Sequence, residues 1–254
     1  MLKKIFLITF LLIAAGAQAS PSRNLTIFAE PNIASALTKI ARIYSPMNNV
    51  IISINFGSSY NLISNIDSGE PVDIFISAHK GWIESLHQKG VVDVYNVGYI
   101  AQDNLVLATL KTNSNIPEEL QKGKISPKQA LTVLNESKAT IILDEEGNSA
   151  GYYAKKFLDE LALSNLKNFS KLAEDKTPLL SIIRNSPTSY ALLLESQINN
   201  KSDFQIIARD DKKDIFYQAL VIAGDNMDTA REFLKFLKSE QAKNILKNSG
   251  FVAN

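Results

Sequence analysis

Residues 51–66, IISINFGSSYNLISNI, constrain the fold most strongly, because they have the pattern of a strand, a tight turn and a helix. The apolar side chains of the first half alternate as in a strand, and Gly57 permits the turn. Ser58 or Ser59 then stands where a helix prefers its N-cap residue. Since the free N–H groups of a helix N-terminus carry partial positive charge, this turn predicts either an ordinary cap or a site for a small anion.

The same order of strand, polar turn and helix recurs along the chain. An early strand precedes a helix that is expected to begin at Ile33, with Asn32 as its N-cap residue. A later strand ends in an acidic turn, and a helix follows the small residues Ser149 and Ala150. The apolar periodicity of residues 228–248 predicts one long helix at the C-terminus.

Strands that alternate with helices predict an α/β fold with two lobes, each a mainly parallel sheet flanked by helices. In open α/β sheets, ligands bind beyond the carboxyl ends of the strands. We therefore expect Asn32, the Ser58-Ser59 pair and the Ser149-Ala150 pair to meet in one cleft between the lobes.

The N-terminus has the features of a secretory signal peptide. Two lysines precede an apolar run at 5–15, and Ala17-Gln18-Ala19 has the form of a small-x-small cleavage site. The run is shorter than the roughly 20 residues that a membrane-spanning helix needs. We expect residues 1–19 to be removed and the mature protein to be exported to the periplasm, with an uncleaved signal anchor as the alternative.

The composition of the mature chain argues against several classes of function. Cleavage removes two lysines and leaves 25 basic against 26 acidic residues, which disfavours nucleic acid or an anionic membrane surface as a partner. The absence of cysteine excludes disulfides, thiolate metal sites and cysteine nucleophiles. His79 and His87 are the only histidines, and neither stands in a nucleophile motif. The acidic turn at 144–147 lacks the spacing of a calcium loop, so we expect no metal, no cofactor and no enzymatic activity.

From Leu25 to Phe251 the chain resembles the periplasmic molybdate-binding proteins of ABC importers. The matching blocks occur in the same order and spacing, and they are TIFAEPNI, FGSSYNL, GEPVDIFISAHKGW, DNLVLAT, LDEEGNSAGYYAKKFL and FLKFLKSEQAKNILKNSGF. The resemblance implies two lobes joined by crossing strands, one made of 24–103 with 219–254 and the other of 104–218. It also implies that a monomer closes on a tetrahedral oxyanion such as molybdate or tungstate and delivers it to a membrane ABC permease.

The resemblance also assigns ligand-binding positions. The family's first-loop serine falls on Asn32, and its second-turn serine falls on Ser59. One backbone N–H donor falls on Ala150 and another on Lys176, while the family's pocket tyrosine falls on Leu194. With their neighbours, the candidate residues are Asn32, Ser58, Ser59, Ser149, Ala150, Lys176 and Leu194.

Two alternatives follow from the replaced hydroxyl donors at Asn32 and Leu194. The first is a binding protein for a different small anion, of the sulfate, phosphonate or carboxylate type. The second is an adaptor that has no transport role and binds a partner protein in the cleft.

Overall fold

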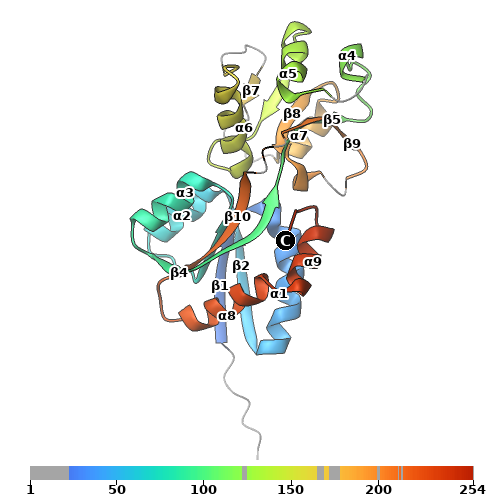
Figure 1. Ribbon diagram of the computed structural model, residues 1–254. Coiled ribbons are helices and arrows are strands. Elements are labelled where there is room, and N and C mark those ends of the chain that lie inside the picture. Colours follow the sequence, from blue (N-terminus) through green and yellow to red (C-terminus); the bar gives the residue numbers. More distant parts are fainter. Residues whose placement is uncertain are drawn as a thin grey trace, which may run out of the picture.

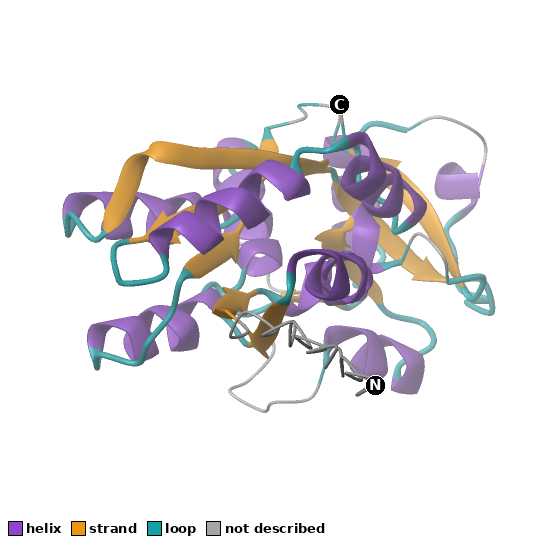
Figure 2. Cartoon of the chain, turned by 90° about the horizontal axis from the view of Figure 1, so that it is seen from below, coloured by secondary structure: helices purple, strands orange, loops and turns teal. Residues whose placement is uncertain are grey.

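The structure, a computed structural model, describes residues 23–121, 125–164, 169–171, 178–198, 201–210, 212 and 214–253. Within these residues the chain forms two five-stranded sheets flanked by helices, which confirms the predicted two-lobed α/β fold (Figure 1). Helices lie on both sides of the strands (Figure 2). In the described part of the chain, no helix has the length and apolar character needed to cross a membrane. The predicted signal peptide and Lys176 lie outside the described residues.

The first sheet has the strand order β2-β1-β3-β10-β4. Its strands are β1 (Arg23–Ala29), β2 (Val50–Phe56), β3 (Ile74–Ser77), β4 (Val92–Asp103) and β10 (Ile215–Ile222). One face is covered by α2 (Ser59–Asp67) and α3 (Lys80–Gln88) (Figure 1). The other face is covered by α1 (Ala34–Asn48), α8 (Met227–Leu237) and α9 (Glu240–Asn248).

The second sheet has the strand order β7-β6-β8-β5-β9. Its strands are β5 (Leu105–Leu110), β6 (Ile141–Leu143), β7 (Phe169–Lys171), β8 (Tyr190–Leu194) and β9 (Phe204–Arg209). The helices of this lobe are α4 (Glu118–Gln121), α5 (Pro127–Glu136), α6 (Ser149–Glu160) and α7 (Leu179–Asn185). Two short 3₁₀ turns complete the described elements, and they are η1 (Pro31–Ile33) and η2 (Glu195–Gln197).

Both sheets are mixed, which corrects the expectation that they are mainly parallel. In the first, β1 runs parallel to β2 and β3, whereas β10 runs antiparallel to β3 and β4. In the second, β6 runs parallel to β7 and β8, whereas β5 runs antiparallel to β8 and β9. A parallel pair needs a crossover connection. The chain instead passes from β4 to β5 through Asn104 alone and returns to the first sheet along β10, and these crossing strands bring the antiparallel pairs.

Two helix boundaries differ from the sequence prediction. The expected C-terminal helix is broken into α8 and α9, because the Ser239 side chain accepts a hydrogen bond from the Ala242 N–H (3.3 Å) and starts a new helix. At the first helix, Pro31 opens the 3₁₀ turn η1, and α1 begins only at Ala34. Asn32 therefore lies inside η1 and is not the N-cap residue of α1.

Strand β1 shows how the sequence fills both layers of the first lobe. Leu25 and Ile27 are buried in the same cluster as Leu37 of α1, whereas Phe28 is buried on the opposite face with Leu62 of α2. Packing on both faces fixes the carboxyl end of this strand, where the polar cleft residues begin.

Asp103 ends β4 at the point where the chain crosses between the lobes. Its carboxylate is buried and accepts hydrogen bonds from the Ser196 hydroxyl group (2.5 Å) and from the N–H groups of Ser196 (3.1 Å) and Asn104 (2.9 Å). Burial raises the pKa of Asp103 from 3.8 to about 7, although the three hydrogen bonds oppose the shift.

We expect the Asp103→Asn variant to lose part of the pH dependence of stability. In the folded protein Asp103 keeps its proton up to about pH 7, whereas the unfolded chain releases it near pH 3.8. The free energy of unfolding contributed by this group therefore falls as the pH rises between these values. Urea unfolding of both proteins across that range should show the variant gaining stability relative to wild type toward neutral pH. A constant difference would contradict a raised pKa.

Candidate functional site

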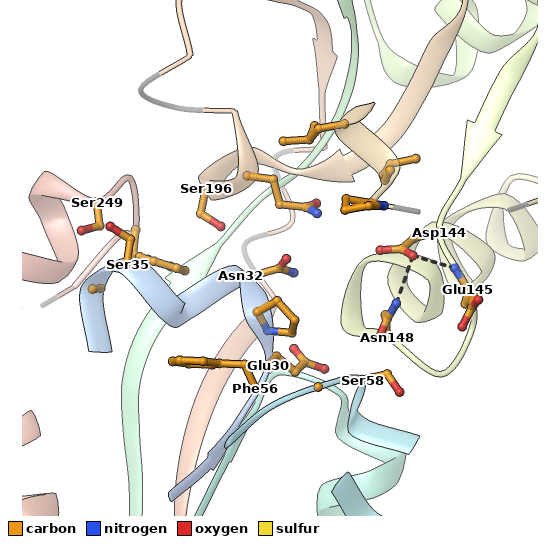
Figure 3. Close-up of a pocket in the computed structure, with 18 of the residues that line it drawn as sticks. Glu30, Asn32, Ser35, Phe56, Ser58, Asp144, Glu145, Asn148, Ser196 and Ser249 are labelled. Atoms are coloured by element: carbon orange, nitrogen blue, oxygen red, sulfur yellow. Dashed lines mark hydrogen bonds between the residues drawn. The ribbon is translucent and has the colours of Figure 1, made fainter. Parts of the chain in front are cut away.

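A cleft of about 790 Å³ opens between the two lobes. Residues of the first lobe, including Glu30, Asn32 and Ser58, face Asp144 and Asn148 of the second lobe (Figure 3). The further lining residues include Ser35, Lys39, Phe56, Glu145, Ser196, Gln197, Lys201 and Phe251. The turns at the carboxyl ends of β1, β2 and β6 therefore meet at one cleft, as the sequence predicts.

Glu30, the residue directly after β1, is the polar centre of this site. Its side chain is 1% exposed, and its carboxylate accepts hydrogen bonds from both lobes. From the first lobe the donors are the hydroxyl groups of Ser59 (2.5 Å) and Ser77 (3.2 Å). From the second lobe Ser149 donates its hydroxyl group (2.6 and 2.8 Å to the two carboxylate oxygens) and its N–H group (3.2 Å). A carboxylate of the protein itself thus occupies a set of oxyanion donors.

Two helix N-termini converge on the Glu30 carboxylate. Ser59 is the first residue of α2, which Ser58 caps by accepting a hydrogen bond from the Asn61 N–H (3.2 Å). Ser149 is the first residue of α6. Each N-terminus contributes partial positive charge, and the Ser149 N–H group also donates to Glu30, a combination that favours an anion.

The turn before α6 is held rigidly, which fixes the position of Ser149. One Asp144 carboxylate oxygen accepts hydrogen bonds from the Glu145 N–H (2.8 Å) and from the Asn148 side chain (3.0 Å), shown as dashed lines in Figure 3. Gly151 packs directly on this turn, because a Cβ atom at this position would lie 2.0 Å from the Glu145 carbonyl oxygen.

Three further contacts join the lobes on the side of α3 and α6. The Tyr60 N–H donates to the Gly147 carbonyl oxygen (3.3 Å), and the Tyr153 hydroxyl group donates to the Ala78 carbonyl oxygen (3.1 Å). His79 Nε2 lies 3.0 Å from the Glu146 carbonyl oxygen. Since His79 Nδ1 accepts a hydrogen bond from the Trp82 N–H, Nε2 is the ring nitrogen that donates. The lobes are therefore closed on this side.

Among the described residues, the groups that donate hydrogen bonds to the Glu30 carboxylate are all neutral. Burial raises the pKa of the Glu30 carboxyl, while the hydrogen bonds from Ser149, Ser59 and Ser77 act in the opposite direction without cancelling the shift. Burial also raises the pKa of Tyr217 well above its ordinary value, and the carboxylates of Glu30 and Asp103 add to this effect. The site therefore disfavours a second uncompensated negative charge.

Five of the candidate residues from the sequence lie at or beside this centre. Asn32 and Ser58 line the cleft, and Ser59 and Ser149 bind the Glu30 carboxylate. Ala150 is fully buried in the first turn of α6. The roles of these residues in ligand binding stay predictions.

One candidate, Leu194, is not brought to the site. Leu194 is fully buried in the core at the end of β8, and its N–H donates to the Gln197 side chain (2.8 Å). It does not line the cleft in the described part of the structure. Lys176 lies outside the described residues.

Sequence reasoning missed Glu30 and Ser77, which complete the cluster. Both follow buried strand residues of neighbouring parallel strands, since Glu30 comes directly after β1 and Ser77 ends β3. A charged residue at the end of an apolar strand, directly before a proline, was the available signal.

Comparisons with known proteins identify the family of this chain. The family model described as bacterial extracellular solute-binding protein matches residues 25–252. The molybdate-binding protein of Haemophilus influenzae is 27% identical over 253 residues, which cover 96% of each chain.

Two solved structures share the fold. The substrate-binding domain of a putative molybdenum ABC transporter from Clostridium difficile superposes with a TM-score of 0.68 at 25% identity, covering 92% of this chain and all of that one. The tungstate ABC transporter structure from Geobacter sulfurreducens gives a TM-score of 0.73 at 15% identity, covering 89% of this chain and 98% of that one. With the family model matching nearly the whole described chain, the protein belongs to the bacterial extracellular solute-binding protein family.

Proposed function

We propose that this protein is the extracytoplasmic solute-binding component of an ABC importer and that it binds a tetrahedral oxyanion in the cleft between its lobes. One observation carries the proposal: the hydroxyl groups of three serines, two of which are the first residues of helices, and the N–H group of Ser149 converge on a single buried carboxylate. A carboxylate is itself an oxyanion, so these donors have the geometry to hold another one. The similar proteins from Haemophilus influenzae and Geobacter sulfurreducens are a molybdate-binding protein and a tungstate ABC transporter, which supports a tetrahedral oxyanion.

The rest of the proposal concerns how the protein acts in the cell. We infer that the signal peptide is cleaved after Ala19, and that a periplasmic monomer without enzymatic activity delivers the anion to a membrane permease. We also propose that 24–103 with 219–254 form one lobe and 104–218 the other. The passage of β4 into β5 supports the boundary after residue 103. The membership of β10 in the first sheet supports the return to the first lobe, although this strand already pairs there from Ile215.

Ligand binding should stabilise the mature protein. A ligand that binds only the folded state at a hundredfold excess over its dissociation constant adds about 2.7 kcal/mol to the free energy of unfolding. Thermal unfolding and calorimetry with molybdate, tungstate, sulfate and phosphate should show this for at least one anion. Amino acids and sugars should have no effect.

Ser59→Ala tests whether this cleft is responsible. Loss of one buried donor should weaken anion binding by about 1 to 3 kcal/mol. Ser64→Ala is the matched control, because Ser64 lies exposed on the same helix and should leave affinity unchanged. If no tetrahedral anion binds wild type, the proposed function is wrong and the adaptor hypothesis gains support.

A further inference from the structure

The donors that would hold an added oxyanion already bind Glu30. Ser59, Ser77 and Ser149 all donate to its carboxylate, and Ser149 does so with both its hydroxyl and its N–H group. An anion in this part of the cleft must therefore share these donors with Glu30. Because Glu30 itself lines the cleft, the two groups would be direct neighbours.

Glu30 cannot leave the site by a small backbone movement. Its N–H donates to the Ile76 carbonyl oxygen (3.2 Å) in β3, and its carbonyl oxygen accepts from the Ile33 N–H (3.3 Å) in η1. Pro31 follows directly and restricts the backbone further. The backbone therefore holds Glu30 at the cleft, within reach of a bound anion.

An ionised Glu30 carboxylate and a fully deprotonated anion cannot hydrogen-bond to each other. Both groups only accept hydrogen bonds, so side by side they repel each other with no hydrogen between them. One proton between them converts this repulsion into a short O–H···O bond, which is among the strong hydrogen bonds in proteins.

We propose that Glu30 makes oxyanion binding depend on one shared proton. A fully deprotonated anion such as molybdate or sulfate binds together with a proton taken up from solvent onto the Glu30 carboxyl. An anion that carries its own proton, such as hydrogen phosphate or hydrogen arsenate, donates that proton to ionised Glu30 and needs no uptake. This inference rests on the proposed function and specifies which tetrahedral anions the site accepts at a given pH.

Several described groups near Glu30 titrate, and one of them, Asp144, faces Glu30 across the cleft and has a pKa raised by burial. Burial raises the pKa of Tyr153 in α6 and of Tyr217 in β10 above the ordinary tyrosine value, and the negative charge of Glu30 raises both further. Both tyrosines therefore stay neutral. Ser59 of α2 and Ser77 of β3 do not titrate between pH 5 and 8. His79 follows β3, and burial lowers its pKa. Asp103 does titrate in this range and therefore needs its own control.

Isothermal titration calorimetry in buffers of different ionisation enthalpy measures the proton uptake directly. Wild type should take up about one proton per sulfate or molybdate bound above the pKa of Glu30, and its affinity should fall about tenfold per pH unit there. Hydrogen phosphate should bind with much smaller uptake and should exceed sulfate in affinity at about pH 8. Glu30→Gln should abolish the uptake and the pH dependence, because the amide donates a hydrogen at every pH.

Asp103→Asn should keep both the uptake and the pH dependence, and loss of either in this variant would assign the proton to Asp103 and overturn the proposal. Sulfate or molybdate binding to wild type without proton uptake would overturn it while leaving the proposed function intact. If no anion binds at any pH, the proposed function itself fails. If the Glu30→Gln variant does not fold, the proton uptake measured with wild type still tests the proposal.

Discussion

Gly151→Ala should destabilise the protein by at least about 2 kcal/mol and weaken anion binding at the same time. A Cβ atom at residue 151 would lie 2.0 Å from the Glu145 carbonyl oxygen and 2.5 Å from that of Asp144. These neighbours are backbone atoms of a hydrogen-bonded turn, so the turn itself must move. Because Ser149 starts the helix after this turn, its two bonds to Glu30 should be lost or lengthened.

Whether Gly151→Ala lowers or raises the free energy of unfolding distinguishes the effect of packing from that of helix propensity. Gly151 lies within α6, where intrinsic propensity alone would make alanine more stable than glycine by about 1 kcal/mol. Gly224→Ala is the matched control, because a Cβ atom there would meet nothing within 4 Å. Urea unfolding of the two variants should give a large loss at 151 and little change at 224. A more stable Gly151→Ala protein would show that the turn adapts freely.

Local sequence patterns predicted the cap of α2 but not the exact start of α6. Ser58 caps α2, because capping depends on a few consecutive residues that the sequence displays directly. Helix α6 begins at Ser149, inside the small-residue turn that was expected to precede it. The meeting of these turns in one cleft followed from a general rule of α/β sheets. Strand direction was less predictable, since β10 pairs with β3 and β4, more than 100 residues away along the chain.

The chemistry at the centre could not be predicted from neighbouring residues. Glu30 gains its role from Ser77 and Ser149, which are 47 and 119 positions away in the sequence. The resemblance to molybdate-binding proteins assigned Leu194 to the ligand pocket. In the structure this residue ends a buried strand and packs in the core. Which side chains surround an anion depends on how the two lobes pack against each other. This packing cannot be predicted from the sequence of a single strand or helix.

Removal of the Glu30 carboxylate should make the stability of the protein depend on added anions. In Glu30→Ala, Ser59 and Ser77 can still pair with each other (2.8 Å), but both Ser149 donors lose the acceptor that the structure gives them. A buried donor without an acceptor costs about 1 to 3 kcal/mol. Relief of the cost of burying a charge offsets part of this loss, so we expect the free energy of unfolding to fall by about 2 kcal/mol.

Formate should restore the stability of Glu30→Ala, because a free carboxylate can enter the space left by the side chain and accept the same hydrogen bonds. Wild type should respond much less to formate, since its own carboxylate already accepts the hydrogen bonds that formate would accept in the variant. Glu30→Gln is the matched control: it keeps the size of the side chain and one acceptor oxygen, so it should lose less stability and show no rescue. Thermal unfolding with and without formate, with chloride at equal ionic strength, measures both effects. If formate stabilises all three proteins equally, the anion acts elsewhere, and Glu30 does not organise the donors of the cleft.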